Sequence, residues 1–173
     1  RLCLAPVAEL QPAYLIIGTD RPKVTRALRR LRDRVGEAAT EHLSAHDARG
    51  DDVAAACNAL GLFTVERRLV VVDSVERWKA DDVKAVAEYL ARPAPTTVLT
   101  LVGDEVKKDS ALAKAVAKAG KVLVYDIPKG RGSKADLPKW VEQQFSERGI
   151  QVDRDAARAL VELAGENADE ILT

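Results

Sequence analysis

The chain has 173 residues, of which 47% are hydrophobic, and its 27 basic and 27 acidic side chains give a net charge of zero. This length suits one full domain with a small second one, and the apolar content excludes wholesale disorder. The zero net charge argues against a tail that coats nucleic acid, although it is compatible with a local basic face. No apolar run reaches the length of a membrane span and no signal peptide is recognisable, so we expect a cytoplasmic protein without membrane contact.

The cysteines and the chain ends add two expectations. Cys3 and Cys57 are isolated and lack the spacing of metal ligands, so we expect free thiols in a reducing cytoplasm. The sequence begins at Arg1, contains no methionine and stops at Thr173, inside what is predicted to be a newly started helix. It is therefore predicted to be a fragment of a longer protein.

The first strong apolar run, residues 14–17, breaks at Gly18 and is followed by a helical pattern. A strand that turns through glycine into a helix is where nucleotide-binding α/β proteins cradle phosphate. The Walker pattern requires a second glycine followed directly by Lys and Ser/Thr, whereas this stretch reads Lys23-Val24-Thr25. Pro22 removes one N–H group from the cradle, and Asp20 adds a negative charge. Gly18, Lys23 and Thr25 therefore indicate a degenerate phosphate loop, in a protein that works by contact rather than hydrolysis.

The helix predicted after this loop is strongly basic. Seven Lys or Arg residues lie within Arg21–Arg34, against the single acid Asp33, and the apolar stripe consists of Val24, Leu28, Leu31 and Val35. Two interpretations are open: the solvated face of an amphipathic helix, or a contact with a nucleic-acid backbone or an acidic partner. No aromatic residue lies between the arginines, which argues against base stacking there.

The next elements alternate between strand and helix. We expect a short polar strand near 41–45, followed by a helix that opens at the turn 49–52 and is closed by Gly61. The apolar stripe of this helix consists of Val53, Ala56, Cys57 and Leu60. Further strands are expected at 69–73, 97–102 and 122–125, with helices between them at 80–91 and from Ser110 to Gly120. Such alternation implies a parallel sheet covered on both faces, with right-handed crossovers. The predicted fold class is an α/β three-layer sandwich with a central five-stranded parallel sheet.

The pattern changes after Asp126. Residues 128–135 are predicted to be a basic linker between a first domain at 1–127 and an incomplete helical domain at 136–173. In the latter, we expect Asp136 to cap a helix that has Pro138 in its first turn and ends at Gly149. A second helix starts at Asp153 with its inward side chains at Ala156, Ala157, Leu160 and Leu163, and a third starts with the capping box Asn167 and Glu170. An α/β core followed by a helical bundle suggests an AAA+ module with its lid.

Other candidate sites are weak. Asp73 ends a strand as a Walker B aspartate does, but Ser74 follows it where a working ATPase has a second acid. Both halves of a Mg-nucleotide site are thus predicted to be degenerate, and we expect no cofactor. His42 and His46, beside Asp47, offer two metal ligands without a third, so we expect exposed histidines and no metal.

The segment 59–64 contains one large apolar side chain, Phe63, that the pattern of the neighbouring helix does not account for. Leu60 completes the stripe of the preceding helix, and Leu62 is able to fold back after the glycine cap. Phe63 has no such local explanation. It either packs into the core or forms, with Leu62, an exposed wedge for a partner's pocket. Burying both would be worth roughly 1.5–3 kcal/mol each, enough for a binding hot spot.

Several of these pieces together resemble one family, the delta subunits of the bacterial DNA polymerase III clamp loader. The matching pieces are Tyr14-Leu15-Ile16-Ile17-Gly18-Thr19-Asp20, then Leu60-Gly61-Leu62-Phe63 followed by residues 67–72, then Leu137-Pro138-Lys139-Trp140-Val141, and the helices through residues 164–167. The resemblance rests on their order and spacing rather than on any single piece.

The resemblance implies a non-catalytic AAA+ protein that does not bind ATP and belongs to a DNA-directed DNA polymerase holoenzyme. In that family a Leu-Phe pair after a helix of the first domain binds the ring-shaped sliding clamp (beta) and opens it for loading onto DNA. The pair falls on Leu62 and Phe63, with Leu60 in a supporting position, while Ala59 departs from the Gln common at the start of this motif.

The implied partners are the sliding clamp, the clamp-loader ATPase and delta-prime subunits, and primer-template DNA within the assembled complex. The family's third domain, a helical collar, is absent from this sequence, so stable assembly into a loader is not expected of it. Two alternatives belong to other classes. A degenerate P-loop ATPase or kinase would bind nucleotide and lose it on Lys23→Ala. An inert α/β interaction module of another complex would bury Phe63 and would not bind the clamp.

Overall fold

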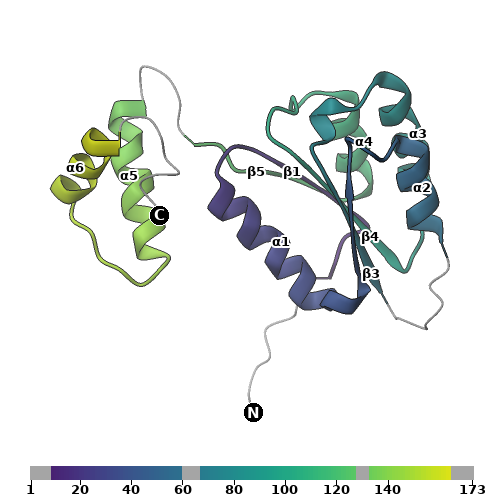
Figure 1. Cartoon of the computed structure of the whole chain (residues 1–173), viewed down its shortest axis with the longest axis horizontal. Helices are drawn as coiled ribbons and strands as arrows, with labels where there is room; N and C mark the ends of the chain where they lie inside the picture. Colours follow the sequence, from purple (N-terminus) through teal and green to yellow (C-terminus); the bar gives the residue numbers. More distant parts are fainter. Residues whose placement is uncertain (1–8, 60–66, 128–132, 165–173) are drawn as a thin grey trace, which may run out of the picture. The chain divides into compact units, whose positions relative to one another are not determined.

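A computed structural model of the chain describes residues 9–59, 67–127 and 133–164 (Figure 1). Its first unit is built on a five-stranded sheet with the order β2-β3-β4-β1-β5. The strands are β1 (Ala13–Ile17), β2 (Thr40–Ser44), β3 (Arg68–Asp73), β4 (Thr97–Gly103) and β5 (Lys121–Val124). Every neighbouring pair is parallel. The predicted α/β fold class is thereby confirmed.

Helices cover both faces of this sheet. They are α1 (Arg21–Val35), α2 (Gly50–Asn58), α3 (Ala80–Ala91) and α4 (Ala111–Ala119), with short 3-10 turns η1 (Glu37–Ala39) and η2 (Val75–Arg77). In Figure 1, α1 lies on one side of the sheet and α2, α3 and α4 lie on the other. The three layers follow from this arrangement, as the alternation of strand and helix predicted.

The side chains of each strand are divided between the two faces, because successive residues of a strand point to opposite sides. The buried side chains that point toward α2, α3 and α4 include those of Leu15, Ile17, Val70, Val72, Leu99 and Leu101. Toward α1 point Tyr14, Ile16, Leu69, Val71, Val98 and Val102, also buried. The continuous apolar runs that predicted central strands thus reflect burial on both faces.

Because all strands are parallel, their carboxyl ends meet at one edge of the sheet. Ile17 of β1 is in register with Gly103 of β4 and with Val124 of β5. The loops that follow β1, β4 and β5 therefore leave the sheet side by side. This carboxyl edge holds the phosphate-loop position, while the opposite, amino edge holds the starts of β3 and β4.

The predicted end of α2 is wrong. The helix ends at Asn58, and Ala59 is its C-cap with an extended backbone (φ −60°, ψ 128°). Leu60 and Gly61, which were expected to complete the helical stripe and to cap the helix, lie outside the described residues. The helix begins at Gly50 with Arg49 as its N-cap, inside the predicted turn 49–52, and the Asp52 carboxylate accepts the Arg49 N–H at 2.9 Å.

The second unit consists, in its described part, of two helices, α5 (Ser133–Ser146) and α6 (Arg154–Ala164). Their contact buries Leu137, Trp140, Val141 and Ala157. Contacts within the chain divide it into a unit that ends at Tyr125 and a unit that begins at Asp126. The predicted domain boundaries at 127 and 135 stay predictions.

Two details of the second unit differ from expectation. Helix α5 begins at Ser133, not after Asp136, so Pro138 lies inside the helix with its ring buried rather than in the first turn. In α6, Ala156 is exposed and the Leu163 side chain is 86% exposed, because among the described residues the packed stripe of α6 consists of Ala157, Leu160 and Val161. The Asp153 carboxylate caps α6 by accepting the Ala156 N–H at 2.7 Å, as predicted. The capping box Asn167 and Glu170 lies outside the described residues.

Candidate functional site

The phosphate-loop position lies between the end of β1 and the start of α1. Gly18 has φ 135°, a backbone conformation that favours glycine. Its N–H donates to the Gly103 carbonyl at 3.2 Å, which ties the loop to β4. The glycine therefore serves the strand-to-helix turn, as it would in a nucleotide-binding protein.

Asp20 places a carboxylate at the N-terminus of α1, the part of a helix at which nucleotide-binding proteins hold phosphate. It is fully buried and is the N-cap of α1, where its Oδ1 accepts the Lys23 N–H at 3.2 Å. Its second carboxylate oxygen lies 3.3 Å from the Lys23 Nζ. A helix N-terminus favours a negative charge, and this one is supplied by the protein itself.

The remaining donors of the helix start also have acceptors within the chain. The Asp20 N–H donates to the Tyr125 carbonyl at 2.9 Å, the Arg21 N–H to Thr19 at 2.9 Å, and the Val24 N–H to the Asp20 carbonyl at 3.0 Å. Pro22 has no N–H to offer. Anion binding at a helix N-terminus needs free donors. From Asp20 to Val24 each backbone donor is already engaged.

The other predicted residues of a nucleotide site lie apart. Thr25 is exposed on α1, and Asp73 is exposed at the end of β3, which β4 separates from β1. The ion pair between Arg21 and Asp104, at 2.6 Å, fastens α1 to the loop that follows β4. Gly18 and Lys23 both belong to the turn from β1 into α1, whereas Asp73 ends a strand that is not adjacent to β1.

Metal and thiol chemistry find little support. His42 and His46 are exposed, and the described residues contain no group of three or more potential metal ligands. Cys57 is a buried free thiol. Desolvation by burial raises its pKa to about 12, so it carries little thiolate at neutral pH. Cys3 lies outside the described residues.

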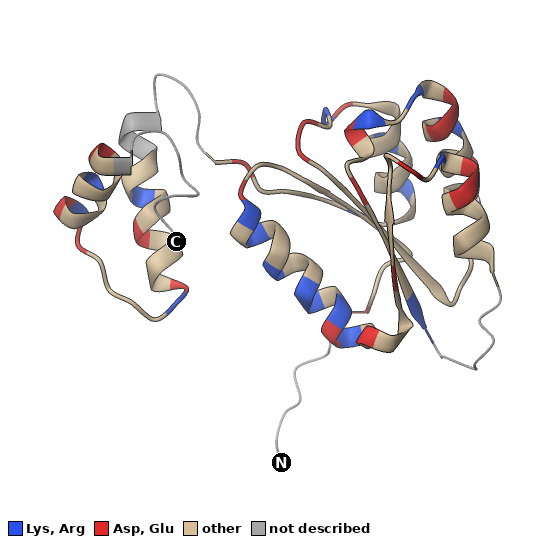
Figure 2. Cartoon of the chain, in the orientation of Figure 1, with Lys and Arg blue, Asp and Glu red and all other residues tan. Residues whose placement is uncertain are grey.

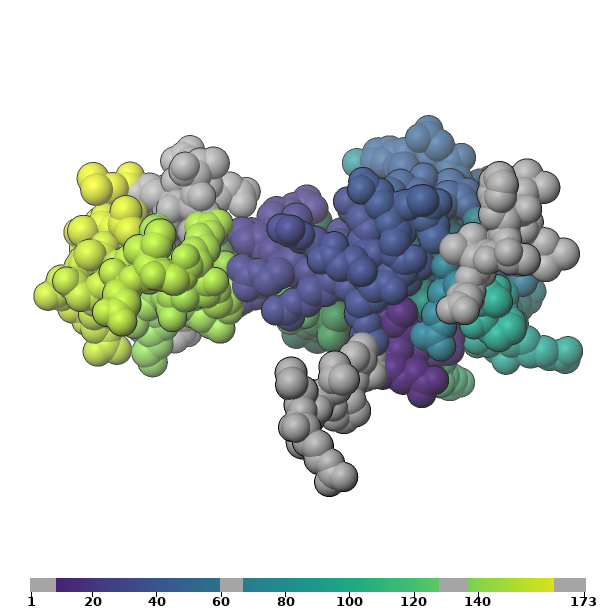
Figure 3. All heavy atoms as spheres, turned by 90° about the horizontal axis from the view of Figure 1, so that it is seen from below, coloured from purple at the N-terminus to yellow at the C-terminus, as the bar shows by residue number. Residues whose placement is uncertain are grey.

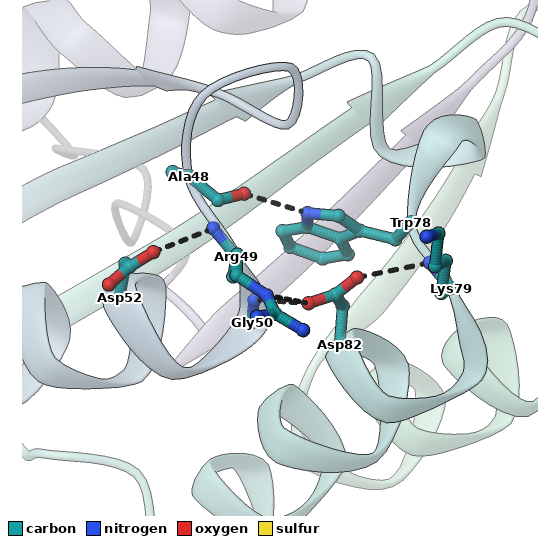
Figure 4. A network of polar contacts seen from close by, with 7 residues as sticks. All are labelled: Ala48, Arg49, Gly50, Asp52, Trp78, Lys79 and Asp82. Carbon is teal, nitrogen blue, oxygen red and sulfur yellow. Dashed lines mark hydrogen bonds and ion pairs between the residues drawn. The ribbon is translucent and has the colours of Figure 1, made fainter.

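The start of α2 is held by the start of α3 (Figure 4). The Asp82 carboxylate accepts the Gly50 N–H and the Lys79 N–H, each at 3.1 Å, so one side chain caps two helices. The Arg49 Nε lies 3.7 Å from the same carboxylate. A Cβ atom at Gly50 would overlap the Asp82 carbonyl oxygen, so only glycine permits this approach. These two N–H bonds hold the pKa of the Asp82 carboxyl below its ordinary value.

The end of α2 is held by the starts of two strands. The buried Thr97 hydroxyl donates to the Cys57 carbonyl at 2.9 Å. The Arg68 guanidinium donates to the Ala59 carbonyl at 2.7 Å and to the Glu41 carboxylate at 2.6 Å. Carbonyls at a helix end need such donor partners. The chain therefore leaves α2 from a fixed point at the amino edge of the sheet.

The predicted clamp-binding residues Leu60, Leu62 and Phe63 lie outside the described residues, within 60–66. The flanks of that segment are described, and they meet through the Arg68 bond to Ala59. The candidate contact segment and the phosphate-loop position thus start from opposite edges of one sheet.

Sequence reasoning missed the residues that fix α2. An Asp three residues after Lys79 is a local signal for the cap of α3, because N3 acids reach back to the N-cap. Nothing local connects Asp82 with Gly50, which lies 32 residues away. Arg68 carried no signal beyond its place before an apolar run.

Fold and site together define an α/β protein whose phosphate loop is closed by its own carboxylate. Residues 14–125 match the family model described as DNA polymerase III, delta subunit. The match spans more than half of the chain, so the chain belongs to the DNA polymerase III delta subunit family.

Solved structures also resemble the chain, two bacterial proteins among them. The DNA clamp loader delta protein of Bacillus subtilis matches with a TM-score of 0.70 and 19% identity over 94% of this chain and 51% of the other. A DNA polymerase III gamma subunit-related protein of Thermotoga maritima matches with a TM-score of 0.51 and 12% identity over 95% of this chain and 72% of the other. At these identities the likeness concerns the fold. The chain spans about half the length of the Bacillus protein. No curated protein sequence matches the chain.

The capping by Asp20 predicts a graded stability series. Asp20→Ala removes both the acceptor of the Lys23 N–H and the partner of its ammonium group, and we expect it to lower the free energy of unfolding by about 1–2 kcal/mol. Asp20→Asn keeps an acceptor and is expected to cost less. Urea unfolding followed by circular dichroism measures both, with the exposed Asp33→Ala as the control on the same helix. Equal, near-zero effects of both substitutions would contradict the capping role.

The Asp82 carboxylate predicts a pH-dependent contribution to stability. Its pKa is lowered in the folded state, so its contribution is present above the unfolded pKa of about 3.9 and is lost as the pH falls through the folded value. Asp82→Asn should therefore be less stable than the wild type at pH 7, and the difference should shrink in acid. Thermal unfolding across the acid range measures it, with the exposed neighbour variant Asp81→Asn as control. A difference that stays constant with pH would exclude the carboxylate as its origin.

Proposed function

We propose that the chain is the non-catalytic, clamp-binding part of a DNA polymerase III clamp-loader subunit that works in DNA replication. The observation that carries this proposal is the match of residues 14–125 to the delta subunit family. The described phosphate loop is consistent with it, because the donors a nucleotide phosphate would need are already engaged. Nucleotide chemistry would then belong to neighbouring ATPase subunits.

The proposed contact is a wedge formed by Leu62 and Phe63, with Leu60 in support. What favours it is the anchoring of the segment's flanks, since Thr97 and Arg68 hold the end of α2. A short segment that starts from fixed ends loses less conformational entropy on binding than one between loose ends. Such preorganisation suits a side-chain pair that has to enter a preformed pocket.

The proposed mechanism is mechanical. The wedge would enter an apolar pocket of the sliding clamp close to a ring interface and would bind more tightly when that interface is open. A ligand shifts an equilibrium only by its differential affinity for the two states, so the population of open rings would rise by that ratio. The delta-prime and ATPase subunits would control access to the wedge, and primer-template DNA would be met in the assembled complex.

The domain plan belongs to the same proposal. Residues 1–127 would form an AAA+-like domain that carries the wedge, residues 128–135 a linker, and residues 136–173 a helical lid.

None of the helices in the described part of the chain combines the length and hydrophobicity that a membrane span requires.

The proposal predicts clamp binding that depends on two side chains. Surface plasmon resonance with immobilised cognate clamp should detect binding of the wild-type chain, and Leu62→Ala/Phe63→Ala should weaken it by roughly a hundredfold or more, because two hot-spot side chains are lost. Ile150→Ala, which removes apolar surface from a 49% exposed side chain of the second unit, is the matched control and should leave binding unchanged.

Circular dichroism checks that each variant is folded. Equal binding by the wild type and the double variant would place the contact elsewhere. A folded wild-type chain without clamp affinity would favour the inert interaction module instead.

A further inference from the structure

Helix α1 holds a concentration of positive charge that the composition of the chain conceals. Its fifteen residues include seven Lys or Arg and one acid, a charge of +6, although the whole chain is neutral. The other residues therefore sum to −6. Figure 2 shows the basic residues repeated along α1. The helices of the opposite face carry fewer basic residues: none in α2, Lys84 in α3, and Lys114 and Lys118 in α4. Segregation of this kind creates a local field that net charge does not report.

The basic side chains of α1 follow the helix in a row. Arg26, Arg30 and Arg34 succeed one another at intervals of four residues, and Lys23 precedes Arg26 by three, so these positions share one flank. The row extends over about 16 Å at 1.5 Å per residue. Val24 and Leu31, on the other side of the helix, are buried against the sheet. Figure 3 shows the atoms of α1 along the surface of the first unit.

Some of these charges are compensated and others are not. Arg21 pairs with Asp104 and Lys23 with the buried Asp20. Arg29 lies 3.9 Å from Asp33, with both side chains largely exposed, and such pairs are weak enough to exchange for another anion. In the described part of the chain, the exposed Arg30 enters no ion pair. Within the row, Arg30 thus presents its guanidinium to solvent.

The chemistry of the row points to phosphate. Six of the seven basic residues in α1 are arginines, whose planar guanidinium binds phosphate oxygens in a bidentate manner. The helix has no aromatic side chain for stacking on bases and no amide side chain for reading them. Phosphate contacts alone position a duplex without specifying sequence.

An acidic protein partner fits the same surface less well. Protein interfaces depend on buried aromatic or aliphatic anchors at their centre. The large apolar side chains of α1 are turned toward the sheet, where Val24 and Leu31 are buried and Leu28 and Val35 pack against the same core. The outward positions are charged or small.

We propose that the outer face of α1 binds the phosphate backbone of duplex DNA without sequence preference. This inference is independent of the clamp-binding wedge.

Fluorescence anisotropy with a labelled duplex of arbitrary sequence tests it, using the 173-residue chain. Arg30→Gln/Arg34→Gln removes two exposed cations four residues apart on α1. Lys114→Gln/Lys118→Gln makes the same charge change at the same spacing on α4, where both lysines are also exposed, on the opposite face of the sheet. Titrations between about 50 mM and about 200 mM salt give the dependence of affinity on ionic strength.

We expect salt-dependent binding by the wild type. The α1 variant should bind about tenfold more weakly at low salt, and its slope of log K against log salt should fall by about 2, since each phosphate contact contributes about 1. The α4 variant should bind within about twofold of the wild type. If the double variant does not fold, the single variant Arg30→Gln is measured in its place, and its slope of log K against log salt should fall by about 1.

Three results would overturn the proposal. They are the absence of duplex binding by the wild type, equal losses in the α1 and α4 variants, and displacement of the duplex by polyglutamate at equal concentration of charge. The last result would identify the row as a site for an acidic protein segment.

Discussion

The carboxylate of Asp20, buried at the N-terminus of α1, is the interaction on which the character of this protein depends. In a nucleotide-binding α/β protein the same position receives a phosphate, because unpaired N–H groups and the helix dipole attract an anion there. Here the protein supplies the anion itself, and Lys23 binds to it at 3.3 Å. The strand, the glycine turn and the helix of a nucleotide site are all retained, while the ligand's place is filled.

A carboxylate in place of a bound phosphate changes the chemistry of the loop and leaves the fold unchanged. The sheet order and the two apolar cores need only the alternation of strand and helix, so they persist whatever the loop binds. What the fold still provides is rigid positioning. Helix α2 is capped at the carboxyl edge by Asp82 and anchored at the amino edge by Thr97 and Arg68. A helix held at both ends is a suitable base for the proposed contact segment.

The sequence predicted the fold well and the site unevenly. The apolar runs of β1 and β3 and the Ser110 cap of α4 are strong local signals, and each element lies where it was expected. Local signals failed where a distant partner decides the outcome. The Asp82 carboxylate accepts the Gly50 N–H from 32 residues away, a contact that no local pattern contains, and α2 ends at Asn58 before the glycine that was expected to cap it. Asp20 was visible as a misplaced charge, but its burial and its bond to Lys23 required the structure.

The most direct measurement is an NMR titration of the isotope-labelled chain with MgATP, observed at the backbone amides of residues 18–24. If Asp20 and its neighbours engage these donors internally, millimolar nucleotide will leave the amide signals unshifted while the rest of the spectrum remains that of a folded protein. Saturable shifts at these amides, abolished by Lys23→Ala, would show that the loop still accepts a phosphate and would contradict a protein that works by contact alone.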